Sequence, residues 1–263
     1  MSGKKRKRNS VDKTRQLARL LLWGLGIVLA VVFFAVVVAT HNHKMEKLAD
    51  NSAAIYQIHG IDVSHHQGKI NWDKVCRATL HKKTISFVFV KCSEGKTKLD
   101  KFYKRNREEV RKHHLKFGAY HFFTPGCSPR EQALLFIHNS GLKNGDLRPV
   151  LDVENKGKIS KQQLIEDVLE WLKIVGKHYN CMPILYTSHT FRTHYLNDER
   201  ISHYPFWKAH YQVGGIITGK NWTFCQYSRR GHVAGIKDGK NNYVDLNVFK
   251  NTPEDLAALT LGE

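Results

Sequence analysis

Residues 148–155 read RPVLDVEN, which is the composition of a buried strand that ends in two acids. The valines and the leucine favour a strand, and a proline is tolerated at its first position. Because successive side chains of a strand point to opposite faces, Asp152 and Glu154 would share one face, with Cβ atoms roughly 6–7 Å apart. Such a pair raises the pKa of at least one acid and can supply a general acid. An isolated Asp-x-Glu pair is more often a loop cap beside a solvated residue, so the rest of the chain decides.

Outward from this stretch, short apolar segments alternate with amphipathic ones. We expect eight strands, over residues 58–63, 86–91, 117–122, 150–153, 184–187, 206–210, 224–227 and 244–248. Helices are expected over residues 72–80, 102–114, from 129 onward, 160–178 and 190–195, with a short one after 252. Because the helices fall mainly in the first half, the pattern predicts an α/β fold, a barrel of the (β/α)₈ type with several helices missing.

In barrels of this type the functional side chains stand at the carboxyl ends of the strands. Acids and aromatic residues fall at the corresponding places here: Asp62, Glu94, Tyr120, His121, Asp152, Glu154, Tyr186, Trp207, His210, Gln226, Tyr227 and Asp245. Carboxylates interleaved with aromatic rings are the lining expected of a carbohydrate cleft, where rings stack on sugars and acids bind hydroxyls.

The N-terminal part has a different composition. Residues 1–19 hold eight Lys or Arg and one Asp, and residues 20–40 hold no charge. An apolar stretch of this length can span a bilayer, and the preceding positive charge predicts a cytoplasmic N-terminus, with residues 41–263 periplasmic or extracellular. We therefore expect a basic cytoplasmic tail at 1–19, a single-pass signal anchor at 20–40 and a polar linker at 41–57. A cleaved signal peptide is the competing interpretation, with a cleavage site near Ala39.

The formal net charge of +19 suits a polyanionic partner such as nucleic acid, anionic lipid or a charged wall polymer. Nucleic acid is disfavoured because no basic recognition helix, zinc knuckle or aromatic RNA-binding signature is present. Five cysteines without CxxC spacing argue against a zinc site and a full disulfide framework. Adjacent His65 and His66 rarely converge on one ion, so we expect no metal and no cofactor.

The chain resembles glycoside hydrolase family 25, the lysozymes that cleave between N-acetylmuramic acid and N-acetylglucosamine in peptidoglycan. The matching segments are GIDVSHHQG at 60–68, INW at 70–72, FVFVKCSEG at 87–95, GAYHF at 118–122, LDVE at 151–154, LYT at 185–187, FWKAHY at 206–211, QYS at 226–228 and YVDLNVF at 243–249. The resemblance implies a flattened eight-stranded barrel over residues 58–250, followed by a short helix and tail at 251–263. The implied partner is a peptidoglycan glycan strand, and we expect a monomer.

The resemblance also implies roles for single residues. Glu154 would be the general acid, and Asp152 would orient or stabilise the reacting acetamido group. Asp62 and Asp245 would complete the acidic cluster, and the implied sugar-subsite residues are Tyr120, Tyr186, Trp207 and Gln226. One departure is Cys225, where the family often carries Trp. Lys91 and Glu94 are expected to form a structural ion pair beneath the site.

Two other functions remain open at this stage. A barrel of this kind could bind wall glycan as a tether without cutting it, although a lapsed enzyme would tend to have lost one of the four acids. A related barrel could instead hydrolyse a chitin-like polymer. Release of reducing ends from purified peptidoglycan distinguishes a hydrolase from a barrel that only binds glycan. A requirement for the muramic lactyl group distinguishes a muramidase from a hydrolase of chitin-like polymer.

Overall fold

The computed structural model describes residues 2–211, 215, 217–237 and 242–262, and for residues 2–18 it describes the backbone alone. The chain divides into two compact units, Met1–Met45 and Glu46–Glu263. Each unit is described by itself.

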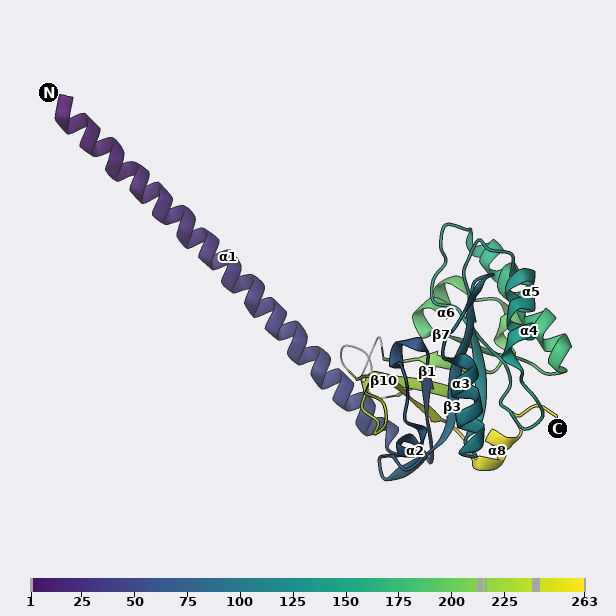
Figure 1. Ribbon diagram of the computed structural model, residues 1–263. Coiled ribbons are helices and arrows are strands. Elements are labelled where there is room, and N and C mark those ends of the chain that lie inside the picture. The colour runs from purple at the N-terminus through teal and green to yellow at the C-terminus, as the bar shows by residue number, and fades with distance from the viewer. Residues whose placement is uncertain (1, 212–214, 216, 238–241, 263) are drawn as a thin grey trace. The chain divides into compact units, whose positions relative to one another are not determined.

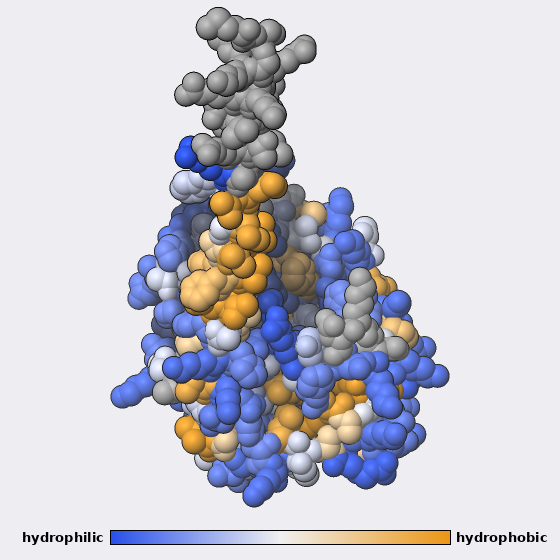
Figure 2. All heavy atoms as spheres, turned by 90° about the vertical axis from the view of Figure 1, so that its left-hand side faces the viewer, coloured by the Kyte–Doolittle hydropathy of each residue, from blue (hydrophilic) through white to orange (hydrophobic). Residues whose placement is uncertain are grey.

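The first unit consists of helix α1 (Ser2–Ala53), which also extends into the second unit (Figure 1). Its segment Arg19–Ala53 is long and apolar enough to cross a membrane by length and composition. The large apolar side chains between residues 20 and 38 are exposed, and they form the orange stretch of the helix in Figure 2.

The boundary between linker and domain differs from the expectation of a polar linker over 41–57. Helix α1 continues to Ala53, and its last turns belong to the globular unit. Ala49 and Ala53 lie one turn apart on one helix face and are both fully buried, because that face packs against the core. The folded domain therefore begins near Glu46 instead of Ile58.

Eight strands close into a barrel among the described residues, which confirms the predicted fold class. They are β1 (Ile58–Val63), β3 (Lys83–Glu94), β5 (Lys116–Phe122), β6 (Val150–Asp152), β7 (Ile184–Ser188), β8 (Phe206–Ala209), β9 (Phe224–Gly231) and β10 (Val244–Phe249). Closure occurs because β1 pairs with both β3 and β10. Neighbouring barrel strands are parallel except β10, which runs antiparallel to β9 and β1. Two-residue strands β2 (Thr79–Leu80) and β4 (Lys98–Leu99) pair with β3.

Helices cover the outside of the barrel in both halves of the domain (Figure 1), so the expectation that they fall mainly in the first half is wrong. They are α2 (Trp72–Val75), α3 (Tyr103–Lys112), α4 (Pro129–Ser140), α5 (Lys161–Tyr179), α6 (His189–Tyr195), α7 (Glu199–Ser202) and α8 (Pro253–Ala257), with a 3₁₀ turn η1 (His65–Gln67) after β1. Side-chain caps start the helices where the sequence places them: Ser128 accepts from the amide of Glu131, and Ser160 accepts from that of Gln163.

The predicted helix over 72–80 is wrong in its second half. Helix α2 ends at Val75, and residues 79–80 form β2 against the start of β3. The two residues between β2 and β3 are His81 and Lys82. Their φ angles of 51° and 64° are those of a two-residue hairpin turn.

Large apolar side chains fill the interior of the barrel away from its polar end. Phe87, Phe89 and Phe224 are fully buried there, with ring centroids 5.1–5.7 Å apart. Glycine stands opposite two of these rings: a Cβ at Gly60 would lie 2.4 Å from Phe87, and one at Gly118 would lie 2.4 Å from Phe89. The aromatic packing thus requires these glycines, and the polar side chains occupy the remaining end of the barrel.

Candidate active site

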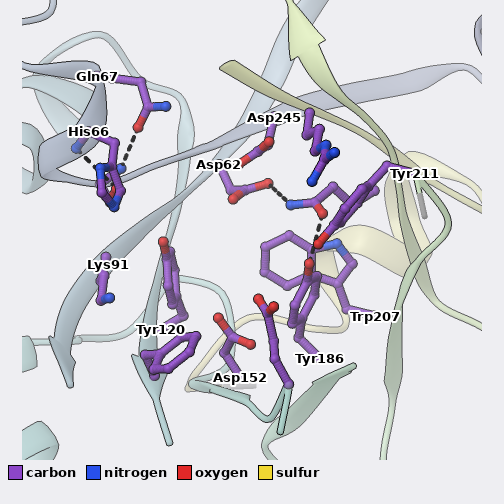
Figure 3. Close-up of a pocket in the computed structure, with 15 residues that line it drawn as sticks. Asp62, His66, Gln67, Lys91, Tyr120, Asp152, Tyr186, Trp207, Tyr211 and Asp245 are labelled. Carbon is purple, nitrogen blue, oxygen red and sulfur yellow. Dashed lines mark hydrogen bonds between the residues drawn. The ribbon is translucent and has the colours of Figure 1, made fainter. Parts of the chain in front are cut away.

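A cavity of about 480 Å³ opens at the polar end of the barrel (Figure 3). All eight residues predicted as catalytic or substrate-binding lie in its wall: Asp62, Tyr120, Asp152, Glu154, Tyr186, Trp207, Gln226 and Asp245. The remaining lining residues are Ser64, His66, Gln67, Lys91, Phe122, Tyr211 and Arg229. The structure therefore gathers one cluster of polar residues from segments throughout the domain.

Asp245 reaches this end of the barrel by a route that strand order alone does not predict. Because β10 is antiparallel to β1, its beginning lies beside the carboxyl end of β1, and Asp245 is the direct partner of Asp62 in the register. The rule that functional residues follow the carboxyl ends of strands therefore does not apply to this strand. Burial raises the pKa of both carboxyls, and the proximity of the pair adds to the increase at Asp245.

Asp62 is held by two side-chain amides. Gln226 Nε2 donates to Asp62 Oδ2 (2.8 Å), and Asn247 Nδ2 donates to the same oxygen (2.7 Å). Each amide is oriented in turn, because Tyr186 Oη donates to Gln226 Oε1 (2.7 Å) and Trp207 Nε1 donates to Asn247 Oδ1 (2.8 Å). These bonds favour the charged form of Asp62 and oppose the effect of burial on its pKa.

Asn247 is a site residue that the sequence argument missed. It is fully buried and lies two residues after Asp245, on the same face of β10. A fully buried amide in a strand requires hydrogen-bond partners, so its place beside a predicted acid was the available signal.

Trp207 is packed in the barrel wall and does not offer an exposed ring face on which a sugar could stack. It is 2% exposed, stacks on Phe89 at 4.5 Å and meets the edge of Tyr186 at 4.7 Å. Only a small part of the indole therefore reaches the cavity. Tyr211 and Phe122 are less buried and line the same cavity.

Asp152 and Glu154 have different surroundings although two residues separate them. Asp152 ends β6 and is buried, and its Oδ1 has no hydrogen-bond partner among the described residues. Burial, and next the charge of Glu154, raise the pKa of Asp152 well above its ordinary value. Glu154 lies beyond the end of the strand and is exposed, and partial burial of its carboxyl raises its pKa while Lys91 and Asp152 oppose the increase. The predicted strand over 150–153 is thus one residue shorter, and Glu154 extends from a loop.

The ion pair predicted between Lys91 and Glu94 is present. Lys91 Nζ lies 2.8 Å from Glu94 Oε2 and 4.7 Å from the ring centroid of Phe122. Hydrogen bonds from Lys91 and Lys98 lower the pKa of Glu94 to about 2. Lys91 also lines the cavity, so its charge acts on Asp152 and Glu154 as well.

His65 and His66 do not share a direction toward one ion. His65 Nδ1 lies 2.9 Å from Asp100 Oδ2, whereas His66 lines the cavity. Within residues 19–211, 215, 217–237 and 242–262 no group of three or more His, Cys, Asp or Glu is placed to hold a metal ion. Cys225 is buried in the barrel wall, where burial raises the pKa of its thiol to about 12.

A closed barrel whose polar end brings four carboxylates and several aromatic side chains around one cavity defines a glycoside hydrolase. The chain belongs to glycosyl hydrolases family 25, whose family model matches residues 61–236. It is accordingly a glycoside hydrolase of the lysozyme type.

Individual relatives cover most of the chain. The uncharacterized protein YegX of Escherichia coli (strain K12) is 40% identical over 214 residues, 80% of this chain and 75% of that protein. Lysozyme M1 of Streptomyces globisporus is 30% identical over 217 residues, 77% of this chain and 71% of that protein. The crystal structure of the bacterial lysozyme from Streptomyces coelicolor superposes with a TM-score of 0.69 at 30% identity, covering 78% of this chain and 98% of that one.

Proposed function

We propose that this chain is a membrane-anchored N-acetylmuramidase, which cleaves the β-1,4 bond between N-acetylmuramic acid and N-acetylglucosamine in peptidoglycan. The observation that carries the proposal is the pair of carboxyls at the end of β6: an accessible Glu154 with a raised pKa beside a buried Asp152 that has an unpaired oxygen. The pair combines a proton donor with an acceptor for a substrate N–H group.

In this mechanism Glu154 gives its proton to the oxygen of the leaving sugar. The carbonyl oxygen of the 2-acetamido group attacks the reacting carbon, while the free oxygen of Asp152 accepts the amide N–H and stabilises the developing charge. Glu154 then takes a proton from the water that opens the intermediate, and the product retains its anomeric configuration. Burial of the Glu154 carboxyl raises its pKa and so favours the protonated form that this step needs, and we assign Asp62 and Asp245 to the same acidic cluster.

Support for the subsite roles comes from the cavity wall. Tyr120, Tyr186 and Gln226 line it, and Trp207 presents part of its indole. We assign these residues to sugar binding, with Tyr186 and Gln226 also orienting Asp62 through their hydrogen bonds.

Anchoring is supported by helix α1. Its exposed apolar stretch follows a basic segment, which matches a single-pass signal anchor with a cytoplasmic N-terminus. The barrel would then lie in a periplasm or outside the cell.

The test is digestion of purified peptidoglycan, with the products analysed by mass spectrometry. A muramidase leaves N-acetylmuramic acid at the new reducing ends. Reducing ends on N-acetylglucosamine would contradict the bond assignment, and an absence of new reducing ends would favour a glycan-binding barrel. Cleavage of a chitin-like polymer without the muramic lactyl group would instead indicate the chitin-type hydrolase.

Two further measurements test the acetamido mechanism. Nuclear magnetic resonance at early times should show retention of configuration, and glycan with de-N-acetylated muramic residues should resist cleavage. Inversion would exclude the mechanism. Normal turnover of the de-acetylated glycan would transfer the nucleophile's role to Asp152 or to water.

A further inference from the structure

A second cavity, of about 860 Å³, lies outside the barrel against the outer face of β8. Phe206 and Lys208 face it, because they alternate along the strand with Trp207 and Ala209, which face the barrel interior. Helices α6 and α7 and the segments 196–198, 203–205 and 218–223 supply the other walls. This β8 cavity shares no lining residue with the active-site cavity.

The lining of the β8 cavity is strongly basic. Arg192, Lys208 and Lys220 contribute three cations, together with two histidines. Asp198 is the one acid among the described lining residues. Its carboxylate already accepts from Arg200, with Nε at 2.9 Å from Oδ1 and Nη2 at 2.8 Å from Oδ2. The cavity therefore carries an excess of positive charge.

Two of the cations have no acidic partner among the described residues: Lys208 is buried, and Arg192 is half-buried. Lys208 is 9% exposed, and its Nζ donates to the carbonyl of Thr218 (3.1 Å). The guanidinium of Arg192 lies 4.3 Å from the ring centroid of Phe206, and its Nη2 donates to the carbonyl of Ser202 (3.4 Å). In the described part of the chain neither side chain forms an ion pair. Burial of a cation beside neutral groups alone is unfavourable, most strongly for Lys208, so both side chains are suited to an anion.

Arg200 shows the contrast on the neighbouring helix. It is paired with both Asp198 and Glu166, and these acids raise its pKa. Burial lowers the pKa of Arg192, and no acid opposes that effect. Arg200 is therefore neutralised by its acidic partners, whereas Arg192 keeps its charge available to a ligand in the β8 cavity.

We propose that the β8 cavity binds a phosphate-bearing group, with Arg192 and Lys208 as its direct ligands and Lys220 at the rim. A phosphate group offers up to two negative charges and several strong acceptor oxygens, which matches a planar guanidinium fork, a point-charge ammonium and a third cation. A single carboxylate would leave more of this positive charge uncompensated. The inference does not depend on the bond that the active site cleaves.

The first experiment measures binding of inorganic phosphate to the full chain in detergent by isothermal titration calorimetry, at constant ionic strength. We expect saturable binding of one phosphate per chain, with acetate binding more weakly. Arg192→Gln and Lys208→Gln should each weaken phosphate binding by about tenfold or more, because each removes a charge-assisted hydrogen bond.

The matched control is the double variant Lys173→Gln and Lys177→Gln, which removes exposed charge from helix α5. It should leave phosphate binding unchanged. Arg192→Lys and Lys208→Arg keep the charge and should retain most of the binding, and circular dichroism verifies that each variant is folded. Absence of saturation, equal binding of acetate, or equal weakening in the control would overturn the proposal.

The second experiment distinguishes the source of the phosphate. Glycerol 3-phosphate is compared with dihexanoyl phosphatidylglycerol below its micellar concentration. Tighter binding of the lipid that is lost in Arg192→Gln supports an anionic headgroup, and equal or tighter binding of glycerol 3-phosphate supports a soluble phosphate ester or polymer. Failure of both to bind would contradict a phosphate site in this cavity, whatever the result of the peptidoglycan digest.

Discussion

Asp152 is buried and Glu154 is exposed because β6 ends between them. The last strand residue is buried in the barrel wall, and the residue two positions later is exposed to the cavity. Burial of an acid with an unpaired oxygen lowers the stability of the fold. In the proposed mechanism the same unpaired oxygen is available to accept a hydrogen bond from the substrate. The proposed division of roles follows from this difference in surroundings.

Glu154→Gln should abolish most of the activity at unchanged stability. Glutamine keeps the shape of the side chain but has no proton to give, and loss of general acid catalysis costs on the order of 10²–10⁴ in rate. The measurement is the release of reducing ends from peptidoglycan, with thermal unfolding as the control. A Gln variant with normal activity would reassign the acid, with Asp62 as the next candidate.

Asp152→Asn should lower activity and raise stability at neutral pH. Because the folded-state pKa of Asp152 lies above its ordinary value of 3.8, the folded chain binds a proton that the unfolded chain has released. The free energy of unfolding therefore falls as the pH rises from about 4 through the folded-state pKa. Asparagine does not ionise, so the variant should gain on the order of 1 kcal/mol at pH 7.

Urea unfolding at pH 4 and pH 7 measures this effect. The stability gain of the variant should be smaller at pH 4, where the wild-type carboxyl keeps its proton in the folded state. A variant less stable than wild type at pH 7 would show that the charged form of Asp152 is stabilised by the fold.

At the scale of single elements, strands β1 and β3 pack closely because a glycine faces an aromatic ring. Gly60→Ala should destabilise the domain by about 1–3 kcal/mol, since its Cβ would lie 2.4 Å from the ring of Phe87. Chemical denaturation measures the loss. Adding Phe87→Leu should recover part of it, and strictly additive losses would show that the clash is not the cause.

The end of helix α1 is an element of the domain and not only its connection. Ser52 Oγ accepts from the amide of Ile217 (3.0 Å), and Asp50 lies 3.1 Å from His81. A chain that starts at Glu46 should therefore be more stable than one that starts at Ala54 by about 1–3 kcal/mol, through lost burial and hydrogen bonding. Urea unfolding of the two chains compares them directly. Equal stabilities would show that the last turns of α1 add nothing to the fold.

At the scale of the whole molecule, the distribution of charge predicts the topology. The basic residues before the apolar stretch should keep the N-terminus in the cytoplasm and place residues 41–263 on the other side. A reporter that is active only in the cytoplasm should be inactive when fused after Glu263 and active when fused before Met1. Strong activity of the fusion after Glu263 would contradict the proposed orientation.

Local patterns in the sequence were sufficient for much of this architecture. Short apolar segments located the barrel strands, and Ser128 and Ser160 marked the starts of α4 and α5. These patterns are reliable because they report which side chains face a core and which backbone groups need a cap within a few residues. The helix over 72–80 was one exception, because pairing of residues 79–80 with β3 overrode the local helical pattern. The linker over 41–57 was another, because helix α1 continues to Ala53.

Asp62, Asp152 and Glu154 could be named from the sequence because each comes at or just after the carboxyl end of an apolar strand, and Asp245 because it stands at the start of one. Their partners could not, since Gln226 and Asp62 are separated by 164 positions and meet only when the barrel closes. The same holds for the antiparallel direction of β10, for the buried amide of Asn247 and for the basic cavity outside β8. The sequence by itself determined which side chains turn inward. The tertiary structure decided which of them meet, because hydrogen-bond partners and strand directions depend on segments that are distant along the chain.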